Sequence, residues 1–118
     1  MTGGWLTTHV LDTARGRAAA GVAVSLWRIE GEQRRLLRET VTNGDGRTDE
    51  PLLAGDAFVA GTYEIVFVVG AYFGGAGDGE DQPFLDRVPV RFGVGDPTAH
   101  YHVPLLVSPW AYSTYRGS

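Results

Sequence analysis

The amino-acid sequence predicts an all-β fold, an antiparallel β-sandwich of seven to eight short strands with one short helix. Segments rich in β-branched and aromatic residues alternate apolar with polar positions, as half-buried strands do. Turn-forming Gly, Pro, Asn and Asp residues separate these segments at regular intervals, which is typical of a sandwich. The 118 residues show no internal repeat, so we expect a single domain over residues 1–118.

The first part of the chain supplies three expected strands. Residues 5–12 form the first, and because both of its faces mix polar and apolar residues, alternation does not decide where His9 points. Residues 13–21 are rich in Ala, Arg and Gly and are expected to form a loop. Residues 22–29 and 35–42 flank a short turn and therefore predict a hairpin.

A tight turn is expected at residues 43–46, because the sequence Asn-Gly-Asp-Gly tolerates the positive φ that such turns demand. Arg47 follows this turn directly. Residues 51–60 are mixed and predict either a short helix or an irregular crossing. Residues 61–69 form the clearest strand, and since both of its faces are largely apolar we expect it at the centre of a sheet.

The last part of the chain begins with a glycine-rich segment, residues 70–82, in which we expect one turn of helix near residues 71–73 and then an open loop. Residues 83–94 alternate cleanly, and Pro89, which has no N–H, indicates an edge strand or a bulge. One turn then leads to a strand at residues 100–107, and a second turn leads to the last strand.

Composition excludes several functional classes. The net charge of −4 argues against a nucleic-acid partner. The absence of cysteine excludes disulfides, thiolate metal sites and cysteine catalysis. No signal-like segment begins the sequence and no apolar run approaches the roughly 20 residues of a membrane helix, so we expect a soluble cytoplasmic protein without a membrane partner.

Two of the three histidines, His100 and His102, lie two residues apart on one expected strand and therefore project from the same face. Tyr101 projects from the opposite face, toward the core. Together with His9, the two could supply the three imidazoles of a hydrolytic zinc site, which would lower the pKa of a bound water. Paired histidines on a strand more commonly form an exposed polar face.

A metal-free site is the other chemical interpretation. A neutral histidine can take a proton from water near pH 7 because its ordinary pKa lies close to that value. Arg47 would keep its charge, and its paired N–H groups can hold a planar anion or polarise a carbonyl. Spacing alone favours an ordinary exposed arginine at this position.

Four segments resemble the transthyretin-related 5-hydroxyisourate hydrolase family. They are residues 6–12 (LTTHVLD), 42–47 (TNGDGR), 100–106 (HYHVPLL) and 108–118 (SPxxYSTYRGS). The resemblance runs nearly end to end and in the right order. The final Tyr-Arg-Gly-Ser is its most specific part, because it separates the hydrolases from transthyretin proper. The glycine-rich loop conforms least.

The resemblance implies the transthyretin-like (prealbumin-like) sandwich of two four-stranded sheets, with the short helix within residues 72–75. It also implies a homotetramer, a dimer of dimers with the active sites at the dimer–dimer interface. The implied reaction is the hydrolysis of 5-hydroxyisourate to 2-oxo-4-hydroxy-4-carboxy-5-ureidoimidazoline in urate degradation. Neither a metal nor an organic cofactor is expected.

The resemblance also assigns site residues to matching positions. The catalytic residues would be His9, Arg47, His102 and Ser118, and the substrate-binding residues would be His9, Arg47, Tyr115, Arg116, Gly117 and Ser118. We expect His102 or His9 to be the base for water and Arg47 to hold and polarise the ring carbonyl. The tail would contact the ring and exclude bulk water. His100 is expected to be a supporting neighbour and ranks below His102.

Two other functions stay open. A transthyretin-like binding protein without catalysis predicts an apolar channel, which His9, Arg47 and His102 would make charged and narrow. A structural sandwich module appended to enzymes would resemble parts of the first half of the chain. That module would leave the His-Tyr-His strand and the terminal motif unexplained.

Overall fold

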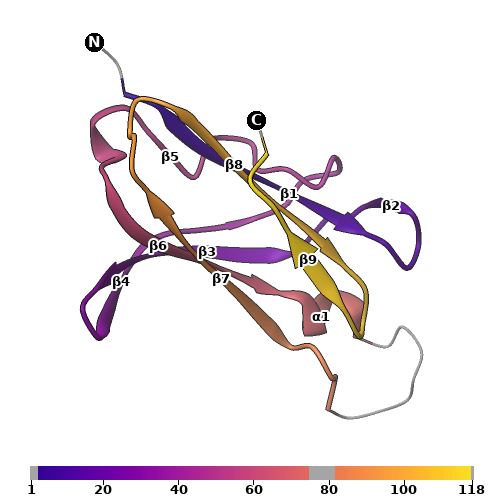
Figure 1. Ribbon diagram of the computed structural model, residues 1–118. Coiled ribbons are helices and arrows are strands. Elements are labelled where there is room, and N and C mark those ends of the chain that lie inside the picture. Colours follow the sequence, from indigo (N-terminus) through magenta and orange to yellow (C-terminus); the bar gives the residue numbers. More distant parts are fainter. Residues whose placement is uncertain (1–2, 75–81, 118) are drawn as a thin grey trace.

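The computed structural model describes residues 3–74 and 82–117, which form two β-sheets packed face to face (Figure 1). The first sheet contains β1 (Trp5–Asp12), β2 (Arg17–Ala18), β5 (Leu53–Ala54), β8 (His100–Val107) and β9 (Tyr112–Thr114). The second contains β3 (Ala23–Glu30), β4 (Gln33–Val41), β6 (Gly61–Val68) and β7 (Arg87–Val94). The strand orders are β2-β1-β8-β9, with β5 paired to the start of β1, and β4-β3-β6-β7.

The core lies between the sheets, where alternate residues of the long strands meet. Leu6, Val10, Tyr101, Leu105 and Val107 from the first sheet and Val24, Leu26, Tyr63, Ile65, Phe67 and Val88 from the second are buried. Burying a large aliphatic or aromatic side chain contributes about 1.5–3 kcal/mol. The residues that alternate with them on β1 and β8 lie on the outer face of the first sheet, and this decides the direction of His9.

Several sequence predictions are confirmed. The strand expected at the centre of a sheet is β6, which lies between β3 and β7. Pro89 lies in β7, the edge strand of that sheet. The predicted hairpin is β3–β4, and the turn at residues 43–46 forms as expected.

Other segments differ from the prediction in detail. The helix α1 spans Val69–Phe73, so it contains the turn of helix expected near residues 71–73 and begins before the range 72–75 that the resemblance implies. Its residues Val69, Gly70 and Phe73 are buried. Residues 51–60 contain β5 and a short 3₁₀ helix at Gly55–Ala57, so the expected short helix is present in 3₁₀ form. The expected loop at residues 13–21 contains the two-residue β2. The glycine-rich loop predicted after α1 lies outside the described residues.

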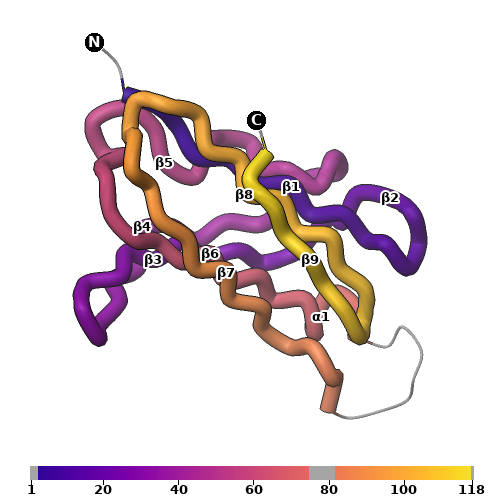
Figure 2. Tube along the Cα trace, viewed as in Figure 1, coloured from indigo at the N-terminus to yellow at the C-terminus, as the bar shows by residue number. Residues whose placement is uncertain are grey.

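The pairing of β1 with β8 is parallel, whereas the prediction was of an antiparallel sandwich. The other strand pairs in the described ranges are antiparallel. Parallel neighbours need a long crossover instead of a hairpin, and here the whole second sheet separates β1 from β8 in the sequence (Figure 2). The register sets Thr7 opposite His102 and Trp5 opposite His100.

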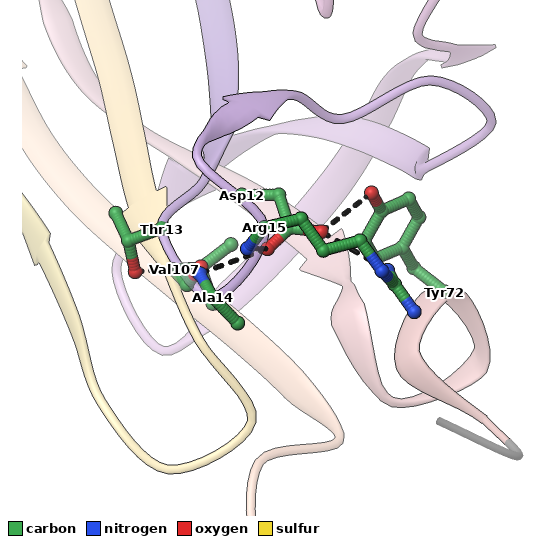
Figure 3. A network of polar contacts seen from close by, with 6 residues as sticks. All are labelled: Asp12, Thr13, Ala14, Arg15, Tyr72 and Val107. Carbon is green, nitrogen blue, oxygen red and sulfur yellow. Dashed lines mark hydrogen bonds and ion pairs between the residues drawn. The ribbon is translucent and has the colours of Figure 1, made fainter. Parts of the chain in front are cut away.

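A buried carboxylate closes the far end of β1 (Figure 3). Asp12 Oδ1 accepts hydrogen bonds from the backbone N–H groups of Ala14 and Arg15 at 3.0 and 2.9 Å. Asp12 Oδ2 accepts from Arg15 Nη1 at 3.1 Å and from the Tyr72 hydroxyl at 2.8 Å. The Tyr72 contact ties α1 to the end of β1, so this network, which we call the Asp12 anchor, joins the helix to the first sheet.

Within residues 3–74 and 82–117, no helix is both long enough and apolar enough to cross a membrane. The longest α-helix of this part of the chain is α1, with five residues.

Candidate active site

The candidate active site lies on the outer face of β1 and β8. There the ring centroids of His9 and His102 are 6.5 Å apart, and those of His100 and His102 are 6.1 Å apart. All three side chains are half-buried. Both strands are interior members of their sheet, so pairing on two sides holds the histidines on a rigid support.

The tight turn after β4 brings Arg47 close enough to His9 and His102 for its charge to lower the pKa of both. Its Asn43 side-chain oxygen accepts hydrogen bonds from the backbone N–H groups of Asp45 and Arg47 at 2.9 and 3.2 Å. The turn rests on β1, because Val10 N donates to the Gly46 carbonyl oxygen at 2.8 Å. Gly46 has a φ of +75°, and a Cβ there would overlap the Val10 carbonyl oxygen, so the position requires glycine.

His9 is held by the same turn. Its Nε2 lies 2.9 Å from the carbonyl oxygen of Asp45. Because a carbonyl oxygen can only accept a hydrogen bond, we assign the hydrogen of neutral His9 to Nε2. The lone pair of the ring is then on Nδ1.

His102 is held on two sides. Its Nδ1 lies 2.8 Å from Thr7 Oγ1. On another side, Gly117 N donates to the His102 carbonyl oxygen at 2.7 Å, and a Cβ on Gly117 would lie only 2.6 Å from the ring atom Cδ2. Glycine therefore lets the tail pack directly against this ring. His102 Nε2, on the side of the ring away from Thr7, has no hydrogen-bond partner among the described residues.

Burial and nearby positive charge make both imidazoles weaker bases than usual. Burial lowers the pKa of His102 below its ordinary 6.5, and the charges of Arg47, His100 and His9 lower it further. Burial and then Arg47 lower the pKa of His9, against a smaller opposing effect of the hydrogen bond to Asp45. Both rings are therefore neutral at pH 7, with a lone pair available for a proton.

The alternative of a zinc site finds no ligand set in the part of the chain that the structure describes. No group of three or more His, Cys, Asp or Glu residues is arranged there to hold a metal ion. One nitrogen of His9 is bonded to the Asp45 carbonyl, and one nitrogen of each of His100 and His102 is bonded to the Thr7 hydroxyl. The arrangement instead offers two neutral bases and a fixed cation to a small polar substrate.

The model of the HIUase/Transthyretin family matches residues 6–117, nearly the whole chain. The chain belongs to the HIUase/Transthyretin family. The resemblance of the four sequence segments to this family is thereby confirmed.

Relatives agree with this membership. A 5-hydroxyisourate hydrolase 2 of Rhizobium meliloti (strain 1021) is 58% identical over 116 residues, which cover 98% of this chain and 97% of the relative. The structure of Klebsiella pneumoniae 5-hydroxyisourate hydrolase is similar with a TM-score of 0.79 and 37% identity, covering 98% of this chain and 94% of that one. Sea bream transthyretin in complex with thyroxine is similar with a TM-score of 0.83 at 27% identity, covering 95% and 93% of the two chains. The predicted transthyretin-like sandwich is confirmed.

In this member of the HIUase/Transthyretin family, the tail contributes to two different places. The Arg116 guanidinium carbon lies 4.1 Å from the ring centroid of Tyr101, a residue of the inner face of β8. Tyr115 and Arg116 line a hollow of about 290 Å³ together with residues of β7 and β8. Of the predicted site residues, the structure brings together His9, Arg47, His102 and Gly117, has Tyr115 and Arg116 in the separate hollow, and does not describe Ser118.

Sequence reasoning missed two contributors to this site. Thr7 bonds two histidines through one hydroxyl, and the ring of Trp5 stacks on His100 with centroids 4.7 Å apart and an angle of 18°. Alternation along β1 indicated that Thr7 and Trp5 share a face with His9. Only the parallel register of β1 and β8 puts them against the other two histidines.

Proposed function

We propose that this protein hydrolyses 5-hydroxyisourate, opening its six-membered ring to 2-oxo-4-hydroxy-4-carboxy-5-ureidoimidazoline as a step of urate degradation. The observation that carries the proposal is the convergence of His9, Arg47 and His102, from three separate segments, on one face. The 58% identity with a 5-hydroxyisourate hydrolase over nearly the full chain supports the choice of substrate.

In the proposed mechanism, His102 Nε2 takes a proton from a water molecule while the water oxygen attacks a carbonyl carbon of the ring. Arg47 holds the carbonyl oxygen and stabilises the negative charge that develops on it. The ring C–N bond then breaks, and His102 returns its proton to the departing nitrogen. His102 is neutral at pH 7, as a base must be, because burial and Arg47 lower its pKa.

His9 has a supporting part in this scheme. With Nε2–H directed at the Asp45 carbonyl, its Nδ1 lone pair can accept a hydrogen bond from a ring N–H of the substrate. The tail residues Tyr115, Arg116, Gly117 and Ser118 would contact the substrate and exclude bulk water, and the serine hydroxyl would take part in catalysis. Gly117, packed against His102, is the part of the tail for which the structure offers direct support.

The proposal includes a homotetramer, a dimer of dimers with the sites at the dimer–dimer interface. Exposed aromatic side chains support it: Trp5, which stacks on His100, and Trp110, Tyr112 and Tyr115 of the C-terminal segment are 44–61% exposed and are available for burial against another subunit. Multi-angle light scattering is expected to give four times the monomer mass. A monomer that is fully active would remove the shared interface from the mechanism.

A carrier function is the second candidate, because transthyretin in complex with thyroxine has a similar structure. One assay separates the two. We expect the protein to accelerate the loss of near-ultraviolet absorbance of freshly generated 5-hydroxyisourate well above its spontaneous decay. Binding without acceleration would favour the carrier, and acceleration that disappears with a chelator would favour metal-assisted hydrolysis.

Two variants test the assigned roles. His102→Ala and Arg47→Ala are each expected to lower turnover by about 10²–10⁴-fold, the usual contribution of a general base or a fixed charge. The control is Arg35→Ala, which removes an exposed arginine that pairs with the exposed Glu30. A His102→Ala protein that works at the parental rate would overturn the assignment of the base.

A further inference from the structure

One hydroxyl group joins two of the three histidines. Thr7 Oγ1 lies 2.7 Å from His100 Nε2 and 2.8 Å from His102 Nδ1. Thr7 is half-buried on β1, directly opposite His102 in the parallel register with β8. Neither the proposed reaction nor the family motifs use this contact, although it reaches the proposed base.

The chemistry of a hydroxyl restricts how the two rings can share it. A threonine hydroxyl has one hydrogen to donate and two lone pairs to accept with. If it donates to His102 Nδ1, the hydrogen of neutral His102 is on Nε2. That nitrogen then has no lone pair with which to accept a proton from water. If it accepts from His102 Nδ1–H, the lone pair of His102 is on Nε2, whether the hydroxyl donates to His100 Nε2 or accepts from that nitrogen as well.

We propose that Thr7 and His100 are positioning residues that hold His102 in the tautomer with its hydrogen on Nδ1. In this arrangement the Thr7 hydroxyl accepts from His102 Nδ1–H and donates to His100 Nε2, and His102 Nε2 faces the substrate with its lone pair. The inference deepens the proposed function and rests on it for its catalytic meaning. The tautomer itself can be measured independently of any substrate.

The surroundings hold each member of this chain in place. The ring of Trp5 stacks on His100, with centroids 4.7 Å apart, which fixes the plane in which His100 Nε2 meets the hydroxyl. Gly117 packs against the Cδ2 edge of His102, so the ring cannot swing away from Thr7 without displacing the tail. The proton acceptor is thus oriented from two sides, as bases in active sites generally are.

Among the described residues, three titratable groups from different elements act on His102. His9 on β1, Arg47 in the turn after β4 and His100 on its own strand each act to lower its pKa. From the tail, Arg116 lies over the ring of Tyr101, on the inner face of β8. A change at Thr7 therefore alters hydrogen bonding at Nδ1 while these charges stay in place.

The first experiment reads the tautomer directly. ¹⁵N-labelled protein is examined by NMR near pH 7.5, where the imidazole nitrogens of His102 report whether each carries a hydrogen. We expect a protonated Nδ1 and an unprotonated Nε2 in the parental protein. A hydrogen on Nε2 with a bare Nδ1 would overturn the proposal, whatever the protein does to 5-hydroxyisourate.

The second experiment removes the hydroxyl while keeping the shape. Thr7→Val is expected to lower kcat for 5-hydroxyisourate by about 10- to 100-fold with KM nearly unchanged, as for other supporting partners of catalytic groups. Thr7→Ser restores a hydroxyl and is expected to recover most of the rate. The matched control is Thr13→Val, which removes a similar hydroxyl, bonded to Val107 O at 3.1 Å, in the turn just after the other end of β1.

The pH profile gives the direction of the hydrogen bond. An acceptor at Nδ1–H favours the protonated ring, so its loss in Thr7→Val should shift the acid limb of the kcat/KM profile to lower pH. A shift to higher pH would mean that Thr7 donates to His102, and the proposal would be wrong. Because the hydrogen bond of His100 reaches His102 through the Thr7 hydroxyl, the double variant Thr7→Val, His100→Ala should be no slower than the slower single variant.

These outcomes keep the two proposals apart. A parental protein that does not accelerate 5-hydroxyisourate decay, but shows the Nδ1–H tautomer lost in Thr7→Val, would remove the proposed function and leave the positioning intact. An active parental protein whose rate and His102 tautomer are unchanged by Thr7→Val would remove the positioning role and leave the function intact.

Discussion

The two ends of β1 carry polar networks of opposite character. At one end Thr7 and His9 meet His100 and His102 on the outer face, half-buried and with ring nitrogens that have no partner among residues 3–74 and 82–117. At the other end Asp12 is wholly buried, and both of its oxygens accept two hydrogen bonds. A closed network stabilises a fold, whereas an open one keeps groups available for a ligand.

The causes of the pKa shifts in the two networks also differ. Burial alone would raise the pKa of Asp12, but hydrogen bonds from Tyr72 and Arg15 outweigh it, so the pKa is lowered and the carboxylate stays charged. Around His102, burial and neighbouring positive charges act together to lower the pKa. The anchor therefore satisfies its charge locally, while the histidine face keeps neutral bases beside the Arg47 cation.

The largest effect on the free energy of unfolding is expected from Asp12→Ala, which removes the carboxylate of the Asp12 anchor. It leaves the Tyr72 hydroxyl and two backbone N–H groups without their acceptor, and removing one partner of a buried charge network costs about 3–5 kcal/mol. Urea unfolding followed by tryptophan fluorescence measures the loss. The kcat/KM of the folded fraction should be unchanged, and Asp56→Ala, at an exposed position, is the control.

Removal of residues 115–118 tests the opposite end of β1. We expect turnover to fall by about 100-fold or more, since the contact with His102 is lost. The free energy of unfolding should fall by only about 1 kcal/mol, the scale of the cation–π contact of Arg116 with Tyr101. A truncated chain that fails to fold would show that the tail stabilises the fold, contrary to the role in the active site that we assign to it.

Gly117→Ala tests the contact between the tail and His102 without removing the tail. The added methyl group would lie 2.6 Å from His102 Cδ2, so the ring or the tail must shift. A displaced base should lower kcat by about 10-fold or more, because catalysis depends on alignment within an ångström. Gly93→Ala, where a Cβ would meet nothing within 4 Å, is the control and should keep the parental rate.

The smallest expected effect is that activity and the stabilisation due to Asp12 are lost in two different pH ranges. The lowered pKa of His102 predicts that kcat/KM stays level from neutral pH to below the ordinary 6.5 and then falls as the base is protonated. Asp12 has a lowered pKa in the folded state, so its stabilisation is present above the ordinary 3.8 and is lost as the pH falls through the folded value. Activity should thus be lost reversibly at mildly acidic pH, where the lowered pKa values of His9 and His102 also cost some stability, whereas the stabilisation due to Asp12 is lost only at lower pH.

The anchor and the histidine face were not equally predictable. Resemblance to the hydrolase family pointed to His9, Arg47, His102 and Gly117, which the structure brings together, and it left the part of Thr7 unseen. Asp12 was only the end of an expected strand, because nothing in its neighbourhood of the sequence indicates that Tyr72, 60 residues later, donates to it. Hydrogen bonds between distant segments depend on how the elements pack, and single-strand patterns carry no record of that.

By itself, the sequence determined the all-β class, the inward faces of the clearly alternating strands and the tight turn at residues 43–46. Strand alternation has a period of two and reports burial directly, and the turn depends on the local preferences of Asn and Gly. Only the tertiary structure decided that His9 points outward, that β1 and β8 are parallel, and that Thr7 lies between two histidines. Both faces of β1 are mixed and its partner is almost the whole chain away, so pairing was set by the closure of the core rather than by local sequence.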